Sequence, residues 1–222
     1  MSLKLGTTDI PSLSPGAIRL GANSLDRVYD GTKLIWERGF KYTDPFNNLT
    51  SFTQTSTGSG VGVTTGSARW AGGTDGSAIL LYNSLALTTN QYIGATMSTM
   101  SNLGSVIIFH CDSGFTGYYG VGVNNSRISL LRTSGRWSQN TATTYAQFDT
   151  TISVGTIIEA WNINNIFYVA VNGTVVITYT MSSPIIGPTR LYQGFGMFRA
   201  TFANSSNMDV WNGGDAGAWG KI

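Results

Sequence analysis

Glutamate occurs twice in this chain, as Glu37 and Glu159. Hydrolysis of a glycosidic bond needs two carboxylates beside it, one protonated as acid and one ionised as nucleophile or base. Glu159 lies within Ile157–Trp161, with no carboxylate two or four positions away. Four aspartates stand beside turn residues, where the backbone itself favours Asp: Asp112, Asp149, Asp209 and Asp215. The sequence therefore predicts that the protein is not an enzyme, and it predicts no catalytic residue.

The triplet His110-Cys111-Asp112 places a base, a thiol and a carboxylate side by side. Consecutive residues of a strand point to opposite faces, so His110 and Cys111 cannot pair there without a kink. We expect a hydrogen-bonded strand histidine and a small core residue. Cys111 is the single cysteine, which excludes an internal disulfide and a cysteine-rich zinc site. We expect no metal and no cofactor; a calcium site stays open, but no loop carries two carboxylates in close register.

Aromatic side chains interleaved with polar ones offer a different chemistry. Sugar rings stack their C–H faces on Trp and Tyr, and their hydroxyls need amide, carboxylate or guanidinium partners. Residues of these two kinds occur in or next to expected loops, although a β core also consumes aromatic residues. The candidate carbohydrate-binding residues are Trp70, Tyr118, Tyr119, Trp137, Tyr145, Arg136 and Asn124.

The composition predicts the fold class. Charged residues make up 11% of the 222 residues, below the roughly 25% of an average globular chain, so the polar surface is largely neutral. Strong helix formers are scarce, whereas β-branched, aromatic and turn residues abound, which predicts an all-β protein. The net charge is +2, and three dispersed arginines fit a solvated face better than a phosphate track: Arg127, Arg132 and Arg136. We expect no nucleic-acid binding.

Short apolar runs closed by Gly, Asn, Asp or Ser follow from residue 78 onward, as in an antiparallel sandwich. The composition of segment 53–66 predicts a loop or a weak edge strand. Asn172-Gly173, between two β runs, predicts a hairpin with a type I′ turn. The expected strands are 78–82, 91–97, 105–111, 118–123, 127–132, 156–161, 166–171, 175–180 and 195–202.

The first 38 residues repeat a short unit, in which an apolar residue follows each of three glycines by four positions. A glycine turn with a short apolar strand cannot bury its own face, so such units must cover one another or be covered by another chain. An irregular pair of strands is the alternative explanation. We expect residues 1–38 to form an assembly arm and 39–222 a separate domain. The candidate assembly residues are Leu5, Ile10, Leu20, Leu25, Val28, Ile35 and Trp36.

A set of motifs in order resembles the jelly-roll β-sandwich of concanavalin A-like lectins and glucanases, in its laminin G-like branch. The resemblance covers about residues 40 to 212 and lacks the family's catalytic group of Glu, Asp and Glu on one strand. The motifs are 44–47 (Asp-Pro-Phe-Asn), 91–95, 117–121, 155–161, 167–173 and 194–196 (Gly-Phe-Gly).

Joined to the N-terminal segment Leu20–Trp36, the whole chain resembles minor tail proteins of tailed bacteriophages that infect actinobacteria. The resemblance implies a virion protein whose arm binds other virion proteins, and a lectin-like domain that binds host cell-surface glycans without hydrolysis. We further expect a homo-oligomer through the arm. The N-terminus lacks a signal-peptide pattern and no apolar run approaches 18 residues, so we expect synthesis in the host cytoplasm and no membrane insertion. A scaffold or decoration subunit without a ligand is the alternative, and a glycoside hydrolase comes third.

Overall fold

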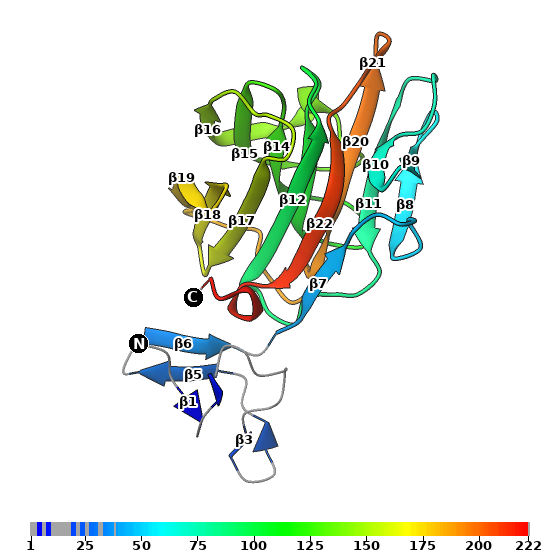
Figure 1. Cartoon of the computed structure of the whole chain (residues 1–222). Helices are drawn as coiled ribbons and strands as arrows, with labels where there is room; N and C mark the ends of the chain where they lie inside the picture. The colour runs from blue at the N-terminus through cyan, green and yellow to red at the C-terminus, as the bar shows by residue number, and fades with distance from the viewer. Residues whose placement is uncertain are drawn as a thin grey trace.

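A computed structural model describes residues 39–221, with Gln139 described by its backbone alone. Of the N-terminal segment it describes the backbone of six short strands, paired as neighbours. In each pair one glycine of the sequence repeat lies in the connection between the two strands. The strands are β1 (Lys4–Leu5), β2 (Thr8–Asp9), β3 (Arg19–Leu20), β4 (Asn23–Ser24), β5 (Arg27–Asp30) and β6 (Lys33–Glu37) (Figure 1).

Residues 39–221 form two antiparallel sheets packed face to face, which confirms the all-β jelly-roll sandwich (Figure 1). Sheet I has the strand order β19 (Thr174–Thr180), β18 (Ile166–Val171), β17 (Ile157–Ile163), β12 (Gln91–Thr99), β22 (Asn207–Asp215), β10 (Ser67–Trp70) and β9 (Val61–Thr64), and β7 (Lys41–Asp44) also pairs with β22. Sheet II has the order β16 (Thr143–Asp149), β15 (Arg127–Thr133), β14 (Tyr118–Val123), β13 (Ser105–Cys111), β20 (Tyr192–Ala200), β11 (Gly76–Tyr82) and β8 (Phe52–Ser56), and β21 (Ala203–Asn204) also pairs with β20.

Two short 3₁₀ helices, η2 (Gln139–Thr141) and η3 (Gly217–Trp219), complete the described part. No helix within it is long and apolar enough to cross a membrane.

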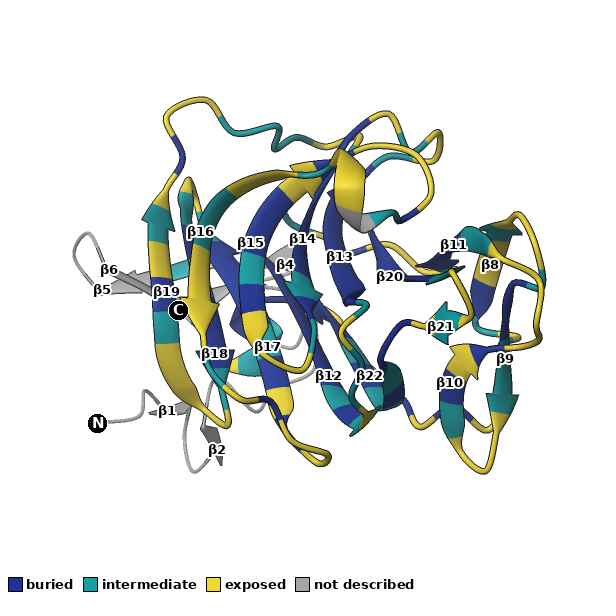
Figure 2. Ribbon diagram, turned by 90° about the horizontal axis from the view of Figure 1, so that it is seen from above, coloured by how far each residue is buried: buried dark blue, intermediate teal, exposed yellow. Residues whose placement is uncertain are grey.

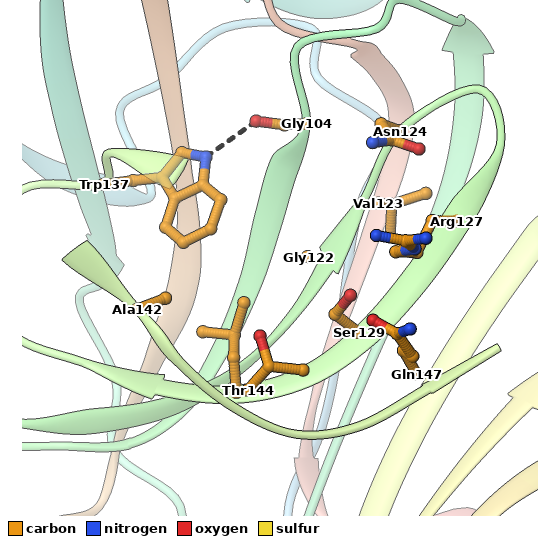
Figure 3. A pocket seen from close by; sticks show the side chains of 11 residues that line it. Gly104, Gly122, Val123, Asn124, Arg127, Ser129, Trp137, Ala142, Thr144 and Gln147 are labelled. Atoms are coloured by element: carbon orange, nitrogen blue, oxygen red, sulfur yellow. Dashed lines mark hydrogen bonds between the residues drawn. The ribbon is translucent and has the colours of Figure 1, made fainter. Parts of the chain in front are cut away.

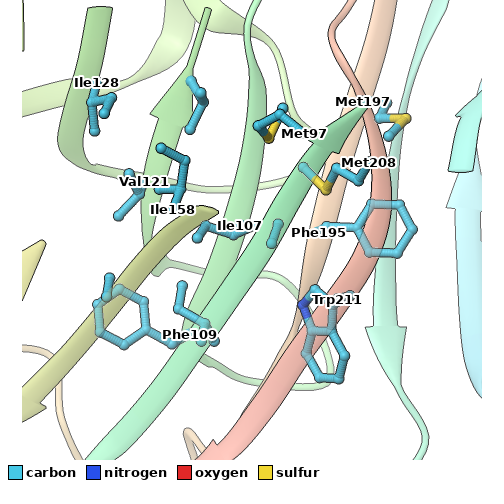
Figure 4. Close-up of a cluster of buried hydrophobic side chains, with 14 of the residues drawn as sticks. Met97, Ile107, Phe109, Val121, Ile128, Ile158, Phe195, Met197, Met208 and Trp211 are labelled. Atoms are coloured by element: carbon cyan, nitrogen blue, oxygen red, sulfur yellow. The ribbon is translucent and has the colours of Figure 1, made fainter. Parts of the chain in front are cut away.

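The main core lies between the two sheets. Strands contribute alternate apolar residues to it, because successive side chains point to opposite faces. Figure 4 shows its centre, where Met97 and Met208 lie between the aromatic rings of Phe195 and Trp211 and the branched side chains at the other end. The core residues labelled there are Met97, Ile107, Phe109, Val121, Ile128, Ile158, Phe195, Met197, Met208 and Trp211.

Sheet II buries its outer face as well. All seven residues of β13 are buried, as expected for a strand that reads Ser-Val-Ile-Ile-Phe-His-Cys without alternation. The residues that alternate with the core positions form a second cluster under the loop that connects β15 to β16. Burial is therefore deepest in the central strands, and exposed residues concentrate on edge strands such as β16 and β19 and on the loops (Figure 2).

The expected strands agree closely with the observed ones, with β20 beginning three residues before the expected start at 195. The polar segment 53–66 contains β9 and all but the first residue of β8, and both are edge strands, which confirms the edge-strand alternative. Five strands of the sandwich were not expected from their patterns: β7, β10, β16, β21 and β22.

Placement of the assembly residues does not test the proposed arm. Val28 is half-buried. Leu5, Leu20, Ile35 and Trp36 lie in strands whose backbone alone is described, and Ile10 and Leu25 lie outside the described residues. The boundary at residue 39 and the assembly role remain predictions.

Asn172-Gly173 connects β18 to β19 as a two-residue turn between the paired residues Val171 and Thr174. Both turn residues have positive φ, 48° and 81°, as a type I′ turn requires. A Cβ on Gly173 would meet no atom within 4 Å, so any penalty of substitution comes from the backbone alone.

We expect Gly173→Val to lower the free energy of unfolding by about 1 to 3 kcal/mol, because a β-branched residue is strained at positive φ. Thermal or urea unfolding measures the change. Gly187→Val is the matched control, since Gly187 has equal space around its Cβ position without a positive φ. An equal midpoint for both variants would contradict the strained turn.

Candidate functional site

A cavity of about 170 Å³ lies on the outer face of sheet II, beside the loop that carries Trp137. Strands β14, β15 and β16 form its floor, and the loop closes one side (Figure 3). Pockets for drug-sized ligands measure roughly 300 to 1,000 Å³, so this one suits a single small ring. The lining residues are Gly104, Gly122, Val123, Asn124, Arg127, Ser129, Leu131, Trp137, Ala142, Thr144 and Gln147.

Trp137 forms the wall of the cavity. Its indole is buried to 1% exposure, and its Nε1 donates to the carbonyl oxygen of Gly104 at 2.7 Å. Two glycines of the sheet make room for it: a Cβ on Gly196 would lie 2.5 Å from the Trp137 Cβ, and one on Gly122 would lie 3.6 Å from its ring. Any side chain at Gly196 would therefore displace the indole and the loop with it.

Polar side chains line the opposite side of the cavity (Figure 3). Ser129 and Gln147 are partners in the β15–β16 register, so their side chains share one face of the sheet. Asn124 accepts a hydrogen bond from the Ser126 backbone N–H at Oδ1, 3.0 Å away. Its amide group therefore has a fixed orientation. The turn uses Oδ1, and the Nδ2 group can donate to a ligand.

Arg127 supplies the charge at this site. Its Nε lies 2.5 Å from Asp149 Oδ1, and both side chains are about half exposed, at 46% and 60%. The ion pair holds the pKa of Asp149 below its usual range, chiefly through the hydrogen bond from Arg127. The pair leaves the remaining guanidinium N–H groups of Arg127 as donors at the cavity.

The polar groups of the cavity can donate and accept hydrogen bonds. The lining residues include no Asp or Glu, so no pair of carboxylates flanks the space. Glu159 is held elsewhere, by the hydroxyl of Tyr92 at 2.8 Å and the ammonium of Lys221 at 2.9 Å. Amide, hydroxyl and guanidinium groups around a small space match the hydroxyls of a sugar ring.

The structure corrects the prediction for four of the candidate aromatic residues. Trp70, Tyr118, Tyr119 and Trp137 are all at most 2% exposed, so none can stack on a sugar. Tyr118 and Tyr119 point to opposite faces of β14, and both are buried because sheet II is covered on both sides. Trp70 is likewise buried, because it packs with the other residues of the main core.

The other candidates divide between sites. Asn124 and the wall residue Trp137 lie at the cavity, whereas Tyr145 is half-buried on β16, with its ring 5.5 Å from that of Tyr179. Arg136 is exposed in the loop. The prediction missed four polar residues of the cavity: Arg127, Ser129, Thr144 and Gln147. Alternation of side chains along β15 and β16 would have indicated them if the sequence had been recognised as a strand at β16.

A second, more open hollow of about 590 Å³ lies at the sandwich edge between β16 and β19. Its lining includes Phe148, 36% exposed, and Val154, 66% exposed, among threonines. No charged side chain lines it, so fewer groups there can orient a polar ligand than at the Trp137 cavity.

No family model matches this sequence, and no curated protein matches it. Solved structures do resemble the fold. A carbohydrate-binding module, CBM66 of Bacillus subtilis, aligns with a TM-score of 0.52 at 13% identity over 75% of this chain and 93% of the module. The sandwich is a lectin-like jelly roll. The exoplasmic/lumenal domain of VIP36 gives 0.54 at 10% identity over 73% of this chain and 84% of its own, and the Emp46p carbohydrate recognition domain gives 0.53 at 8% over 77% and 90%.

Calcium accompanies this fold in some structures, since VIP36 is known in Ca²⁺-bound forms. The described residues of this chain contain no group of three or more His, Cys, Asp and Glu side chains that could hold a metal. Calcium prefers six to eight oxygen ligands with several carboxylates among them. The residues present do not fit such a site.

His110 occupies a buried position between the sheets, at a strand irregularity where its φ is 54°. Its Nε2 lies 2.8 Å from Asn162 Oδ1. Asn162 donates through Nδ2 to two backbone carbonyls, so its Oδ1 accepts and the His110 proton is on Nε2. Nδ1 has no hydrogen-bond partner. The expectation of a hydrogen-bonded histidine holds for one ring nitrogen only; Cys111 is buried in the outer cluster, as expected of a core residue.

Burial lowers the pKa of His110 from 6.5 to about 4, with the hydrogen bond that His110 donates to Asn162 opposing the shift and Arg190 adding to it. The unfolded chain therefore binds a proton between these pH values that the folded chain does not. We expect the free energy of unfolding to fall as the pH drops from 6.5 to about 4, by at most about 3 kcal/mol.

Urea unfolding at pH 4.5 and 7 tests this expectation with His110→Gln as the comparison. The variant keeps an N–H donor for Asn162 but has no titrating group, so the difference between the two pH values should be smaller than in the wild type. An equal difference in both proteins would show that His110 does not contribute to acid lability.

Proposed function

We propose that this protein binds glycans through the Trp137 cavity and does not hydrolyse them. The observation that carries the proposal is the cavity itself, where Asn124, Arg127 and Gln147 converge with hydroxyl groups on a space sized for one ring. Two structural neighbours, a carbohydrate-binding module and a carbohydrate recognition domain, support the proposal because they share this architecture.

The mode of binding differs from stacking on exposed rings. Trp137 contributes the buried wall of the cavity rather than an open platform, because its indole is committed to the sheet. Recognition then depends on hydrogen bonds between the sugar and the protein, which replace the hydrogen bonds that the free sugar makes to water. Such an exchange yields a small net gain in binding free energy per bond. Each site is therefore expected to be weak, and repeated copies would raise avidity by about 10² to 10⁴.

We further propose that the domain serves on a virion, attached through the N-terminal segment. Three strand pairs with a shared glycine spacing support this part, together with the resemblance of that segment to phage minor tail proteins. The alternative is a scaffold or decoration subunit without a ligand. Burial of Trp70, Tyr118, Tyr119 and Trp137 favours that alternative, because these rings serve the core.

Binding to isolated bacterial cell-wall polysaccharides and a glycan array tests the glycan proposal, with the protein displayed in multivalent form. We expect Thr144→Trp, which fills the cavity, to abolish binding, and Gln147→Ala to weaken it several-fold. Thr178→Trp is the matched control, an exposed threonine on the opposite edge strand β19. No binding to any glycan, or equal effects of both tryptophans, would contradict the proposal.

A reducing-sugar assay on the same polysaccharides tests whether the protein hydrolyses them, and we expect no released sugar. Product that disappears in Glu159→Gln would instead establish an enzyme.

Deletion of residues 1–38 tests the attachment role. The remaining domain should stay folded, because β7 pairs with β22 and Asp215 accepts a 2.7 Å hydrogen bond from the Phe40 N–H, both within residues 39–222. We expect an unchanged circular dichroism spectrum and loss of incorporation into virions. A truncated protein that unfolds, or that still assembles normally, would show that the segment is not an attachment arm.

A further inference from the structure

A polar hollow of about 250 Å³ lies on the other side of segment 141–144 from the Trp137 cavity. Ala142 and Thr144 line the Trp137 cavity, whereas Thr141 and Thr143 line this one. Six of its eight lining residues carry a hydroxyl and one carries a guanidinium. The full set is Thr116, Gly117, Arg132, Thr133, Ser134, Thr141, Thr143 and Tyr145.

Two guanidinium groups lie near Gly117, which lines the hollow: that of Arg132, itself a lining residue, and that of Arg190 beside it. A Cβ on that glycine would lie 3.8 Å from Arg190 Nη1 and 3.9 Å from Arg132 Nη2. The absence of a side chain at Gly117 therefore leaves room for both cations to approach the same point.

The two arginines differ in what neutralises them. Arg190 Nη1 lies 3.1 Å from Asp112 Oδ2 and donates to the Gly117 carbonyl, while Nη2 donates to Thr116 Oγ1 at 3.2 Å. Arg132 is exposed and has no ion pair with any described residue. One carboxylate thus faces two cations, which leaves an excess positive charge beside a group of hydroxyls.

We propose that this hollow binds an oxyanion, a carboxylate or a phosphate, of an acidic polyhydroxylated polymer, with Arg132 as the principal partner. The planar guanidinium matches both anions in a bidentate geometry, and hydrogen bonds to charged groups are the stronger ones. Thr133, Thr141 and Thr143 supply hydroxyls for the rest of the ligand. The site stands apart from the Trp137 cavity and does not depend on it.

A nucleic acid fits this hollow less well than an acidic polysaccharide or polyol phosphate. Binding to nucleic acid requires several cations along a backbone and aromatic faces for the bases. Here one arginine has no ion pair among residues 39–221, and Tyr145, the aromatic residue of the lining, is half-buried beside Tyr119 and Tyr179.

Titration of the full-length protein with polygalacturonate, poly(glycerol phosphate) and neutral dextran tests the proposal by calorimetry at low salt. We expect binding of at least one of the two acidic polymers, weakened about tenfold by Arg132→Gln and partly restored by Arg132→Lys. Binding of one polymer only identifies the carboxylate or the phosphate as the ligand group. Binding of neither overturns the proposal.

Arg69→Gln is the matched control, because Arg69 is an exposed arginine on β10 without an ion pair to any described residue. An equal loss in both variants would show a general effect of net charge and would also overturn the proposal. Thr144→Trp should leave binding of the acidic polymers intact, so failure of this site and failure of the glycan cavity are distinguishable. Unchanged unfolding midpoints establish that the variants are folded.

Discussion

Packing of the Trp137 indole against the outer face of sheet II fixes the position of the β15–β16 connection, and both candidate binding sites depend on that position. The sheet provides the place for it through Gly122 and Gly196, which bring no side chain to that face. The 2.7 Å hydrogen bond from Nε1 to Gly104 satisfies the polar atom of the buried ring. Because the indole holds the β15–β16 connection down on the sheet, polar hollows form on both sides of the segment that follows it.

A buried polar network links the sheets at one end of the sandwich. Gln193 of sheet II donates to the Gly214 carbonyl of sheet I at 2.8 Å and accepts from the Gly214 N–H at 2.6 Å. Gln91 accepts from the His110 N–H at 3.0 Å, and its own N–H donates to Asn162 at 2.9 Å. Buried amides are costly unless they are paired, so these contacts specify how the two sheets meet. The unpaired Nδ1 of His110 is the exception within this network.

The two proposed sites divide the recognition of a polymer into a neutral and an anionic part. The Trp137 cavity offers amides and an arginine already paired with Asp149, which suits uncharged hydroxyls. The hollow at Arg132 offers, among threonines, a cation that forms no ion pair with the described part of the chain. Neither site contains a pair of carboxylates, so both are suited to holding a ligand rather than to cleaving it. The lectin-like jelly roll supplies the rigid strands on which such polar groups keep their positions.

The sequence by itself determined the all-β class of this protein and most strands of the sandwich. Runs such as Ser105–Cys111 and the turn at Asn172-Gly173 depend on local periodicity and on the φ that each residue tolerates, and both are properties of short segments. Only the tertiary structure decided which aromatic residues are exposed. Tyr118 and Tyr119 are neighbours on opposite faces of one strand. Tyr119 is buried because the other sheet covers the inner face, and Tyr118 is buried because the cluster that includes Trp137 covers the outer face. The hollows likewise join residues from separate strands and loops. The spacing of these residues along the chain does not indicate that they lie close together in the fold.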